Sequence, residues 1–303
     1  LTLRFLQGFG LSVISAVGYA AIQETFEERD AIKVMALMAN ISLLAPLLGP
    51  VLGAFLIDHV SWHWGFIGIA LLSFLSWFGL KAKMPKQQRS MPKQPIGYIL
   101  DDFKRVFKNK RFLGLTLGLP MVAMPLMLWI ALSPVMLVEE LKLSSFAYGL
   151  SQFPVFMGLI AGNMLLIRII DRFALGRTIF IGVPIMLGGA FCLLAAVFLP
   201  HYALALLLIG MTFISFGEGI CFSVMYRFAL MSSDVSKGTV AAAVSMLLML
   251  SFFVVIEAVR WLYTQVHLIA FSGSCLLLLG LWFTLPRKIL KSLMQQRQQS
   301  GSF

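Results

Sequence analysis

Residues 203–226 read ALALLLIGMTFISFGEGICFSVMY, an apolar run interrupted by a single carboxyl group, that of Glu218. The run is longer than the roughly 20 apolar residues that a helix needs to cross a bilayer, so it predicts a transmembrane helix. An ionisable side chain is costly at that depth, and where one occurs it marks a proton or substrate pathway by default. The stretch therefore favours a membrane transporter.

The composition of the whole chain agrees with this interpretation. Apolar residues make up 59% of the 303 residues and charged residues only 12%, compared with about 25% charged in soluble domains. We therefore expect an all-α polytopic membrane protein. Nine apolar runs are long enough to cross the bilayer, at about 3–26, 33–57, 62–82, 111–138, 146–167, 177–199, 203–226, 239–259 and 264–286.

The Lys and Arg residues lie almost entirely in alternate loops. If the nine segments cross the membrane in turn, all but three of the 24 Lys and Arg fall on one side, and the exceptions are Arg4, Lys142 and Arg260. Cytoplasmic loops carry the excess of positive charge, so we expect the C-terminus in the cytoplasm. The net charge of +11 is then a topology signal rather than a sign of nucleic-acid binding.

One long polar segment, from Lys81 to Lys110, separates the first three expected helices from the last six. Transporters built from two six-helix halves are common, so we expect three further helices upstream of residue 1. A natural protein of nine helices is the alternative. The expected units are the second half of an N-terminal helical bundle (residues 1–82), a cytoplasmic linker with an amphipathic helix (83–110), a C-terminal six-helix bundle (111–286) and a cytoplasmic tail (287–303).

This polar segment changes character at Ile96. Residues 83–95 hold three prolines among Lys and Gln, which is typical of an extended linker. From Ile96 to Phe107, apolar residues recur at spacings of three and four with Lys and Arg between them. The pattern predicts an amphipathic helix on the inner leaflet, although a docking site for a calmodulin-like partner has a similar pattern.

Several motifs resemble those of the major facilitator drug:proton antiporters. Residues 4–8 (RFLQG) and 45–53 (APLLGPVLG) are similar to the Arg-bearing fourth helix and to the Gly-Pro antiporter motif of the fifth helix of that family. Residues 19–24 (YAAIQE), 36–40 (ALMAN) and 233–240 (SDVSKGTV) also resemble its multidrug exporters. The resemblance covers nearly the whole chain and aligns it with helices 4 to 12 of the family.

This resemblance implies a major facilitator fold with nine of the expected twelve transmembrane helices. It also implies proton-coupled export of lipophilic drugs, chloramphenicol among them, across the bacterial inner membrane by alternating access. We expect no cofactor besides the proton gradient, a monomer, and no partners other than lipophilic drugs, protons and the lipid bilayer. A transporter of a physiological solute, and a receptor or scaffold without transport, are the alternatives.

Three residues are candidates for proton coupling: Glu218, Arg4 and Glu24. A carboxyl group that is shielded from water can hold a proton near neutral pH. We expect Glu218 to exchange such a proton for a cationic or polar substrate. The resemblance implies a proton-relay role for Arg4. Glu24 lies about 30 Å further along the same helix, so an acid at the cytoplasmic rim is its alternative role. For Glu218 the alternative is a neutral packing residue.

Helix faces predict the walls of a substrate-binding pocket. Residues of three helices follow one another at helical spacing, which places them on one face of each helix. Pliable Met and flat aromatic side chains suit a promiscuous binder, although lipid-facing Met residues give a similar pattern. The candidate substrate-binding residues are Leu11, Tyr19, Met38, Ser42, Met127, Trp129, Ile130 and Glu218, with Ser15, Pro46 and Pro134 on the same stripes.

The Gly-Pro motif consists of Pro46, Gly49, Pro50 and Gly53. A stripe of small residues lets a neighbouring helix approach closely, and the two prolines remove backbone hydrogen bonds and favour a bend. Membrane helices often contain such residues without a special role. The resemblance implies that this motif seals the two halves of an antiporter.

Residues 171–177 (DRFALGR) are a weaker copy of the Asp-Arg loop of the same family. The spacing is longer than in the family, so Asp171, Arg172 and Arg177 are expected to anchor a cytoplasmic loop. The three cysteines, Cys192, Cys221 and Cys275, all lie inside expected helices and have no metal-binding spacing. No catalytic triad spacing or Gly-rich phosphate loop is evident, so we do not expect an enzyme.

Overall fold

The computed structural model describes residues 2–59, 61, 63–83, 96–173, 176–282 and 288. All regular elements within these residues are helices, as the composition predicts. They are α1 (Thr2–Thr25), α2 (Glu28–Ser42), α3 (Leu44–His59), α4 (His63–Lys83), α5 (Ile96–Lys108), α6 (Lys110–Ser133), the π-helix η1 (Pro134–Glu140), α7 (Ser145–Ile169), α8 (Arg177–Phe198), the short 3-10 helix η2 (Pro200–Tyr202), α9 (Ala203–Leu230), α10 (Lys237–Val266) and α11 (Leu268–Trp282).

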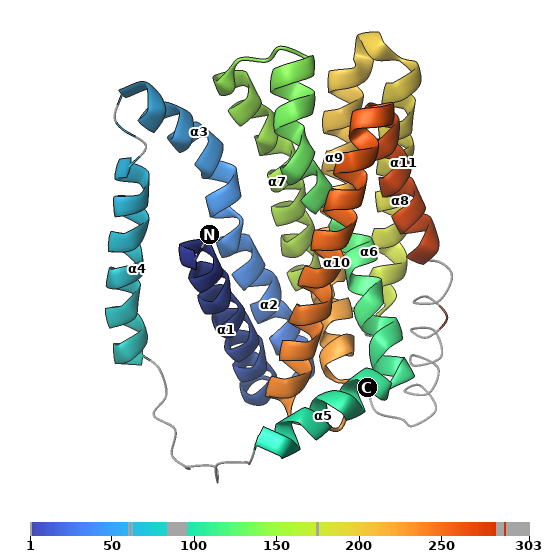
Figure 1. Cartoon of the computed structure of the whole chain (residues 1–303). Coiled ribbons are helices and arrows are strands. Elements are labelled where there is room, and N and C mark those ends of the chain that lie inside the picture. Colours follow the sequence, from blue (N-terminus) through green and yellow to red (C-terminus); the bar gives the residue numbers. More distant parts are fainter. Residues whose placement is uncertain are drawn as a thin grey trace.

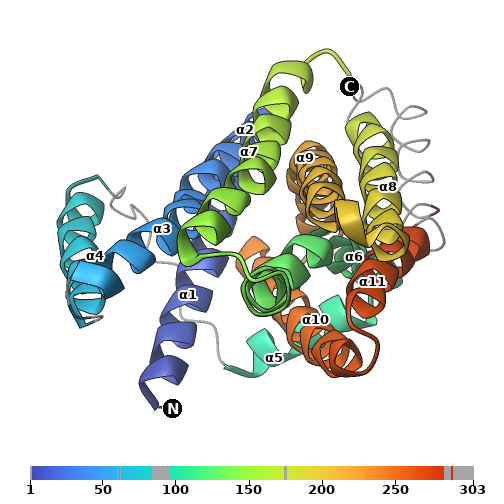
Figure 2. The same cartoon turned by 90° about the horizontal axis from the view of Figure 1, so that it is seen from above.

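The second half of the chain forms a helical bundle in which α9 has the most neighbours. α7 and α8 pack along α9, α6 also lies against it, and α11 packs on α6 and α8 (Figures 1 and 2). The largest fully buried side chains of the described residues belong mainly to this bundle, among them Trp129, Phe156, Phe271 and Trp282. The hydrophobic core of the protein is therefore centred on the C-terminal helices.

The four N-terminal helices are less enclosed by protein. α1 packs on α10, α2 packs on α7 and α9, and α3 packs on α7. α4 lies apart from the bundle in Figure 1, and its residues from Phe66 to Ala82 are exposed. Such an apolar surface is stable in a bilayer, because lipid tails are as apolar as the side chains that face them.

One expected helix, at about 33–57, is divided in the structure. α2 ends at Ser42 and α3 begins at Leu44. Pro46 has no N–H group to donate to the carbonyl group of Ser42, four residues earlier, and this loss weakens the helix at that point. The Ser42 hydroxyl group also donates to the carbonyl oxygen of Met38 at 3.0 Å, a bond that often bends a helix. The bend predicted from the prolines is confirmed, and it lies at Leu43.

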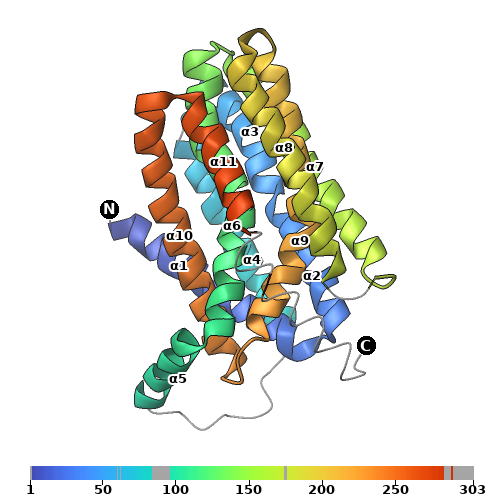
Figure 3. The same cartoon turned by 90° about the vertical axis from the view of Figure 1, so that its right-hand side faces the viewer.

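The expected amphipathic helix is confirmed as α5, which begins at Ile96. Its second half packs against α6 and α10, with Val106 fully buried and the ring of Phe107 next to that of Phe112. Asn109 then caps α6 by accepting from the backbone N–H groups of Arg111 and Phe112. Figures 1 and 3 show α5 across one end of the bundle, which we call the α5 end.

Seven segments among the described residues are long and apolar enough to cross a membrane. They are Glu28–Gly49, His63–Ala82, Lys110–Glu140, Ser145–Ile169, Arg177–Phe198, Pro200–Leu230 and Lys237–Val266, while α11 is shorter. The structure thus confirms a polytopic helical protein, and the expected count of nine spans stays a prediction. The expected tail at 287–303 lies outside the described residues except for Lys288, as does the linker at 84–95.

Candidate functional site

Glu218 lies in the middle of α9 and is buried, with 6% of its surface exposed. Its Oε2 atom has no hydrogen-bond partner among the residues that the structure describes. The hydroxyl oxygen of Ser215, one turn away on the same face of α9, is also buried and unpaired there. Buried polar atoms are normally paired, so two unpaired ones side by side indicate a site for a polar ligand or a proton.

The two glycines beside Glu218 bring neighbouring helices into backbone contact with α9. A Cβ atom at Gly217 would lie 2.5 Å from the carbonyl oxygen of Gly182 in α8. A Cβ atom at Gly219 would lie 2.6 Å from the carbonyl oxygen of Leu159 in α7. Successive helix residues are rotated by about 100°, so the Glu218 side chain leaves α9 on a face that lies between its contact with α8 and its contact with α7.

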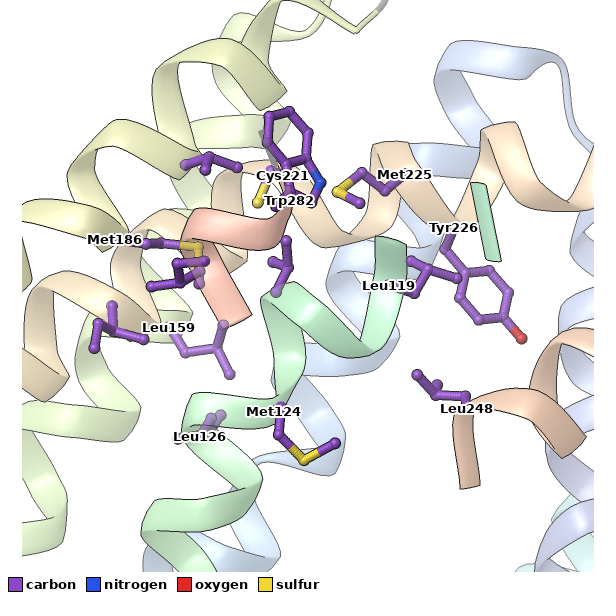
Figure 4. Packing of buried hydrophobic residues seen from close by; sticks show 14 of the residues in the cluster. Leu119, Met124, Leu126, Leu159, Met186, Cys221, Met225, Tyr226, Leu248 and Trp282 are labelled. Atoms are coloured by element: carbon purple, nitrogen blue, oxygen red, sulfur yellow. The ribbon is translucent and has the colours of Figure 1, made fainter. Parts of the chain in front are cut away.

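Apolar side chains surround this part of α9. Figure 4 shows Met225 and Tyr226 of α9 in one cluster with Leu119 of α6, Met186 of α8 and Trp282 of α11. Met186 itself packs against the position of Gly217. Apolar side chains of four helices therefore pack along α9 near Glu218.

An aromatic contact joins α9 to the N-terminal helices. The rings of Tyr19 in α1 and Tyr226 in α9 have centroids 4.5 Å apart, and the ring of Phe222 lies 5.9 Å from that of Tyr226. Phe222 is one turn from Glu218 and Tyr226 is two turns from it, toward the α5 end. Of the predicted substrate-binding residues, Tyr19 is thus the one with a described contact to the helix of Glu218.

The other predicted pocket residues are placed differently. Trp129 is fully buried in α6, and its ring N–H donates to Oε1 of Gln152 in α7 at 2.8 Å. Leu11, Met38, Ser42 and Ile130 are exposed and Met127 is half-buried. The Met38 Cε atom lies 4.0 Å from the Cβ position of Gly18, next to Tyr19. The role of these residues in binding stays a prediction.

The glycines of the Gly-Pro motif do not lie at a helix crossing. No heavy atom of the described residues lies within 4 Å of a Cβ position at Gly49 or Gly53 of α3. Pro46 is half-buried, and the side chain of Pro50 lies outside the described part. The sealing role of this motif stays a prediction, whereas the close helix crossings are those of α9, which sequence patterns did not single out.

The predicted loop anchor has partners on the N-terminal helices. The carboxylate of Asp171, just after α7, lies 2.7 Å from Nζ of Lys33 in α2. The guanidinium group of Arg29 donates to the carbonyl oxygen of Ile170 at 2.6 Å. Arg177 stacks over the ring of Phe173 at 5.9 Å, and Arg172 is exposed. Asp171 therefore connects α7 with α2 at the α5 end, a contact between the two halves of the chain.

The other two candidates for proton coupling lie on α1. Glu24 is exposed in the last turn of this helix, at the α5 end. Arg4 belongs to the first turns of α1, and its side chain lies outside the described part. Neither residue has a described contact with Glu218, and their roles stay predictions.

Metal binding finds no support among the residues that the structure describes. No group of three or more His, Cys, Asp or Glu is close enough to hold a metal ion there. The three cysteines are free thiols.

A partly buried pair of amide side chains also connects the two halves, and sequence patterns did not single it out. Nδ2 of Asn163 in α7 donates to Oδ1 of Asn40 in α2 at 2.7 Å, and Asn163 is only 2% exposed. The two residues are 123 positions apart, so local periodicity holds no signal for the pair. An amide within a long apolar run is the signal that could have drawn attention to Asn163.

Comparisons with known proteins relate this chain to a family. Residues 1–256 match the sequence model of the Major Facilitator Superfamily. The chloramphenicol resistance protein CraA of Acinetobacter baumannii is 71% identical over 297 residues, which are 98% of this chain and 72% of that protein. The multidrug transporter MdfA of Escherichia coli O6:H1 is 46% identical over 257 residues, 84% of this chain and 62% of MdfA. The MdfA of Yersinia pestis bv. Antiqua is 40% identical over 264 residues, 87% of this chain and 64% of that relative.

Proposed function

The chain belongs to the major facilitator superfamily, and on that premise we propose that it exports lipophilic drugs in exchange for protons. Chloramphenicol is the first substrate to test, because a relative with 71% identity is named for resistance to it. The relatives named multidrug transporters support a broad range of drugs. The chain is a transporter and not an enzyme.

The observation that carries the proton-coupling proposal is the buried carboxyl group of Glu218, whose Oε2 atom has no hydrogen-bond partner among the described residues. A carboxyl group surrounded by apolar side chains holds a proton until water or a polar ligand reaches it. The unpaired hydroxyl group of Ser215 offers a second hydrogen-bonding partner on the same face. Binding of a drug with a polar group can then replace the proton, so that one ligand leaves as the other enters.

Alternating access supplies the movement. The contacts between the two halves at the α5 end, Tyr19 with Tyr226 and Lys33 with Asp171, are contacts that must open when the pocket faces that side. In this scheme the residues proposed for proton coupling are Glu218, Arg4 and Glu24. Leu11, Met38, Ser42, Met127, Trp129 and Ile130 are proposed to contact the drug, together with Tyr19.

We assign the α5 end to the cytoplasm of a bacterial cell. The described ends of helices on this side carry most of the Lys and Arg, including the cluster Lys104, Arg105, Lys108 and Lys110. Lys142 and Arg260 lie at the opposite end. The positive-inside rule then supports an inner-membrane protein with nine spans, a cytoplasmic C-terminus and the four-part organisation described above. A monomer that needs no cofactor besides the proton gradient completes the proposal.

Efflux from bacterial cells tests the function. Cells that lack their own drug exporters express the gene that encodes this chain and are loaded with radiolabelled chloramphenicol, with and without a protonophore. We expect export that collapses when the protonophore dissipates the proton gradient. Export that continues without a gradient would contradict proton coupling, and absence of chloramphenicol export would contradict this choice of substrate.

A further inference from the structure

The partly buried amide pair of Asn40 and Asn163 lies where the two halves of the chain meet. α7 uses one face for this hydrogen bond to α2 and another face for its crossing with α9. At that crossing, the backbone nitrogen of Asn163 would lie 2.7 Å from a Cβ atom at Gly219. The residue that holds α2 is therefore also the residue that touches α9 one position away from Glu218.

The neighbouring glycine makes this crossing tight. A Cβ atom at Gly162 would overlap the carbonyl group of Phe216, two residues before Glu218. Backbones in such contact cannot slide past each other without a change in both helices, because packed interiors resist compression. A movement of α9 at Glu218 must therefore move α7 at Asn163.

Other contacts between the two halves of the chain are less suited to transmit a movement of α7 to the N-terminal helices. Lys33 and Asp171 form an ion pair that is partly exposed to solvent, and exposed pairs are weak and screened by salt. The contact of Tyr19 with Tyr226 depends on ring packing, which tolerates sliding. The hydrogen bond between Asn40 and Asn163 is directional and comes from the buried side chain of Asn163, so it fixes the register of α2 on α7.

We infer that Asn163 and Asn40 are positioning residues, which pass a change in the state of Glu218 from α9 through α7 to α2. The inference rests on the proposed function, because it assumes that Glu218 changes state during transport. It assigns the pair no contact with drug or proton. An interhelical hydrogen bond in a membrane shifts an equilibrium about threefold on average and about twentyfold at most.

Distances between the two halves test this inference without any transport assay. Spin labels are attached to the full protein at Leu52 of α3 and Phe198 of α8, both exposed, with the three native cysteines replaced by serine. Double electron–electron resonance then gives the populations of the distances between the halves. Glu218→Gln imitates the neutral carboxyl group, and its effect is measured in the parent protein and in Asn163→Leu.

We expect Glu218→Gln to change the ratio of the populations severalfold in the parent protein and to have little effect in Asn163→Leu. Asn40→Leu removes the same hydrogen bond at its less buried end, so the effect of Glu218→Gln should be small in this variant too. It keeps the inference testable if Asn163→Leu does not fold. In the double variant Asn40→Leu with Asn163→Leu, the effect of Glu218→Gln should be as small as in either single variant, because all three variants lose the same hydrogen bond.

Gln152→Leu is the matched control. It also removes a buried amide of α7, but its bond to Trp129 lies within the C-terminal bundle. The effect of Glu218→Gln should persist in this variant. An undiminished effect in Asn163→Leu and Asn40→Leu would overturn the inference and leave the efflux proposal intact, and so would the absence of any effect of Glu218→Gln in the parent protein.

Discussion

A pair of glycines in α9 and a pair in α3 have different surroundings. Gly217 and Gly219 of α9 lie against the backbones of α8 and α7, whereas Gly49 and Gly53 of α3 have no heavy atom of the described residues within 4 Å of their Cβ positions. Glycine therefore allows a close helix crossing in α9, whereas the described residues form no such crossing at the two glycines of α3. The carboxyl group of Glu218 lies in the crowded helix, where a movement is passed on to its neighbours.

The difference extends to the two halves of the chain. In the C-terminal bundle, helices contact one another backbone to backbone and by buried hydrogen bonds such as that between Trp129 and Gln152. The polar and aromatic contacts that join the N-terminal helices to this bundle include an aromatic pair, a partly buried amide pair and, at the α5 end, one ion pair and the hydrogen bond from Arg29 to Ile170. Stability should therefore depend on the first region, and switching between states on the second.

The largest effect is expected when a side chain is added at the tight crossing. Gly219→Val should destabilise the protein by about 3 kcal/mol or prevent its folding, because backbone atoms of α7 occupy the space. Gly49→Val is the matched change in α3 and should cost much less, since its Cβ position is open. Thermal unfolding of the purified variants in detergent measures both. Equal losses of stability would remove the distinction between the two helices.

A smaller loss is expected for Gln152→Leu. The indole N–H of Trp129 then stays buried without an acceptor, which costs about 1–3 kcal/mol. Trp129→Phe together with Gln152→Leu should recover part of this loss, because no donor is left unpaired. The same thermal unfolding assay is used. A double variant that is less stable than Gln152→Leu would show that packing, and not the hydrogen bond, dominates at this site.

The loss of the aromatic contact between the halves should have a moderate effect. Tyr19→Leu should weaken the contact with Tyr226 by about 1 kcal/mol, the usual value for an aromatic pair. The halves should then separate more readily at the α5 end. The reactivity of a cysteine introduced at Ile22, which is buried one turn after Tyr19, should rise about fivefold toward a maleimide in the purified protein. Unchanged reactivity would mean that this contact does not hold the halves together.

The smallest effect is expected at the exposed ion pair. Lys33→Met should change the stability only slightly, and the change should vanish in high salt, because solvent and ions screen exposed pairs. Unfolding at low and high salt concentrations measures this. A large loss that salt does not reduce would show that Lys33 and Asp171 form a stronger contact than their exposure indicates.

Sequence patterns predicted where the helices lie in the chain better than they predicted how the helices pack against one another. Most expected apolar segments coincide with one helix, and α5 begins at the predicted Ile96. The segment at 33–57 covers α2 and α3, the one at 111–138 covers α6 and part of η1, and the one at 264–286 begins inside α10 and includes α11. Long apolar runs and a period of three to four are local signals, so one sequence suffices to read them. The π-helix Pro134–Glu140 was not predicted, since it depends on how the end of α6 packs.

The contact between Asn40 and Asn163 and the crossings of α9 were not predicted for a different reason. In a soluble protein, polar residues mark the outer face of a helix, but in lipid both faces are apolar and periodicity does not reveal the packed side. The structure places Trp129 in the core and shows no heavy atom of the described residues within 4 Å of the Cβ position of Gly49, while the roles predicted for both residues stay predictions. Glu218 could be singled out from the sequence because a single carboxyl group within a long apolar run is recognisable without knowing how the helices pack.

The most direct test of the central claim is the release of protons when the drug binds. Chloramphenicol is added to the purified protein in a weakly buffered solution, and a pH indicator reports the protons released by the parent protein, by Glu218→Gln and by Glu257→Gln, an exposed carboxylate of α10. We predict release by the parent protein and by Glu257→Gln, and little release by Glu218→Gln. Equal release by all three proteins would contradict the assignment of the exchanged proton to Glu218.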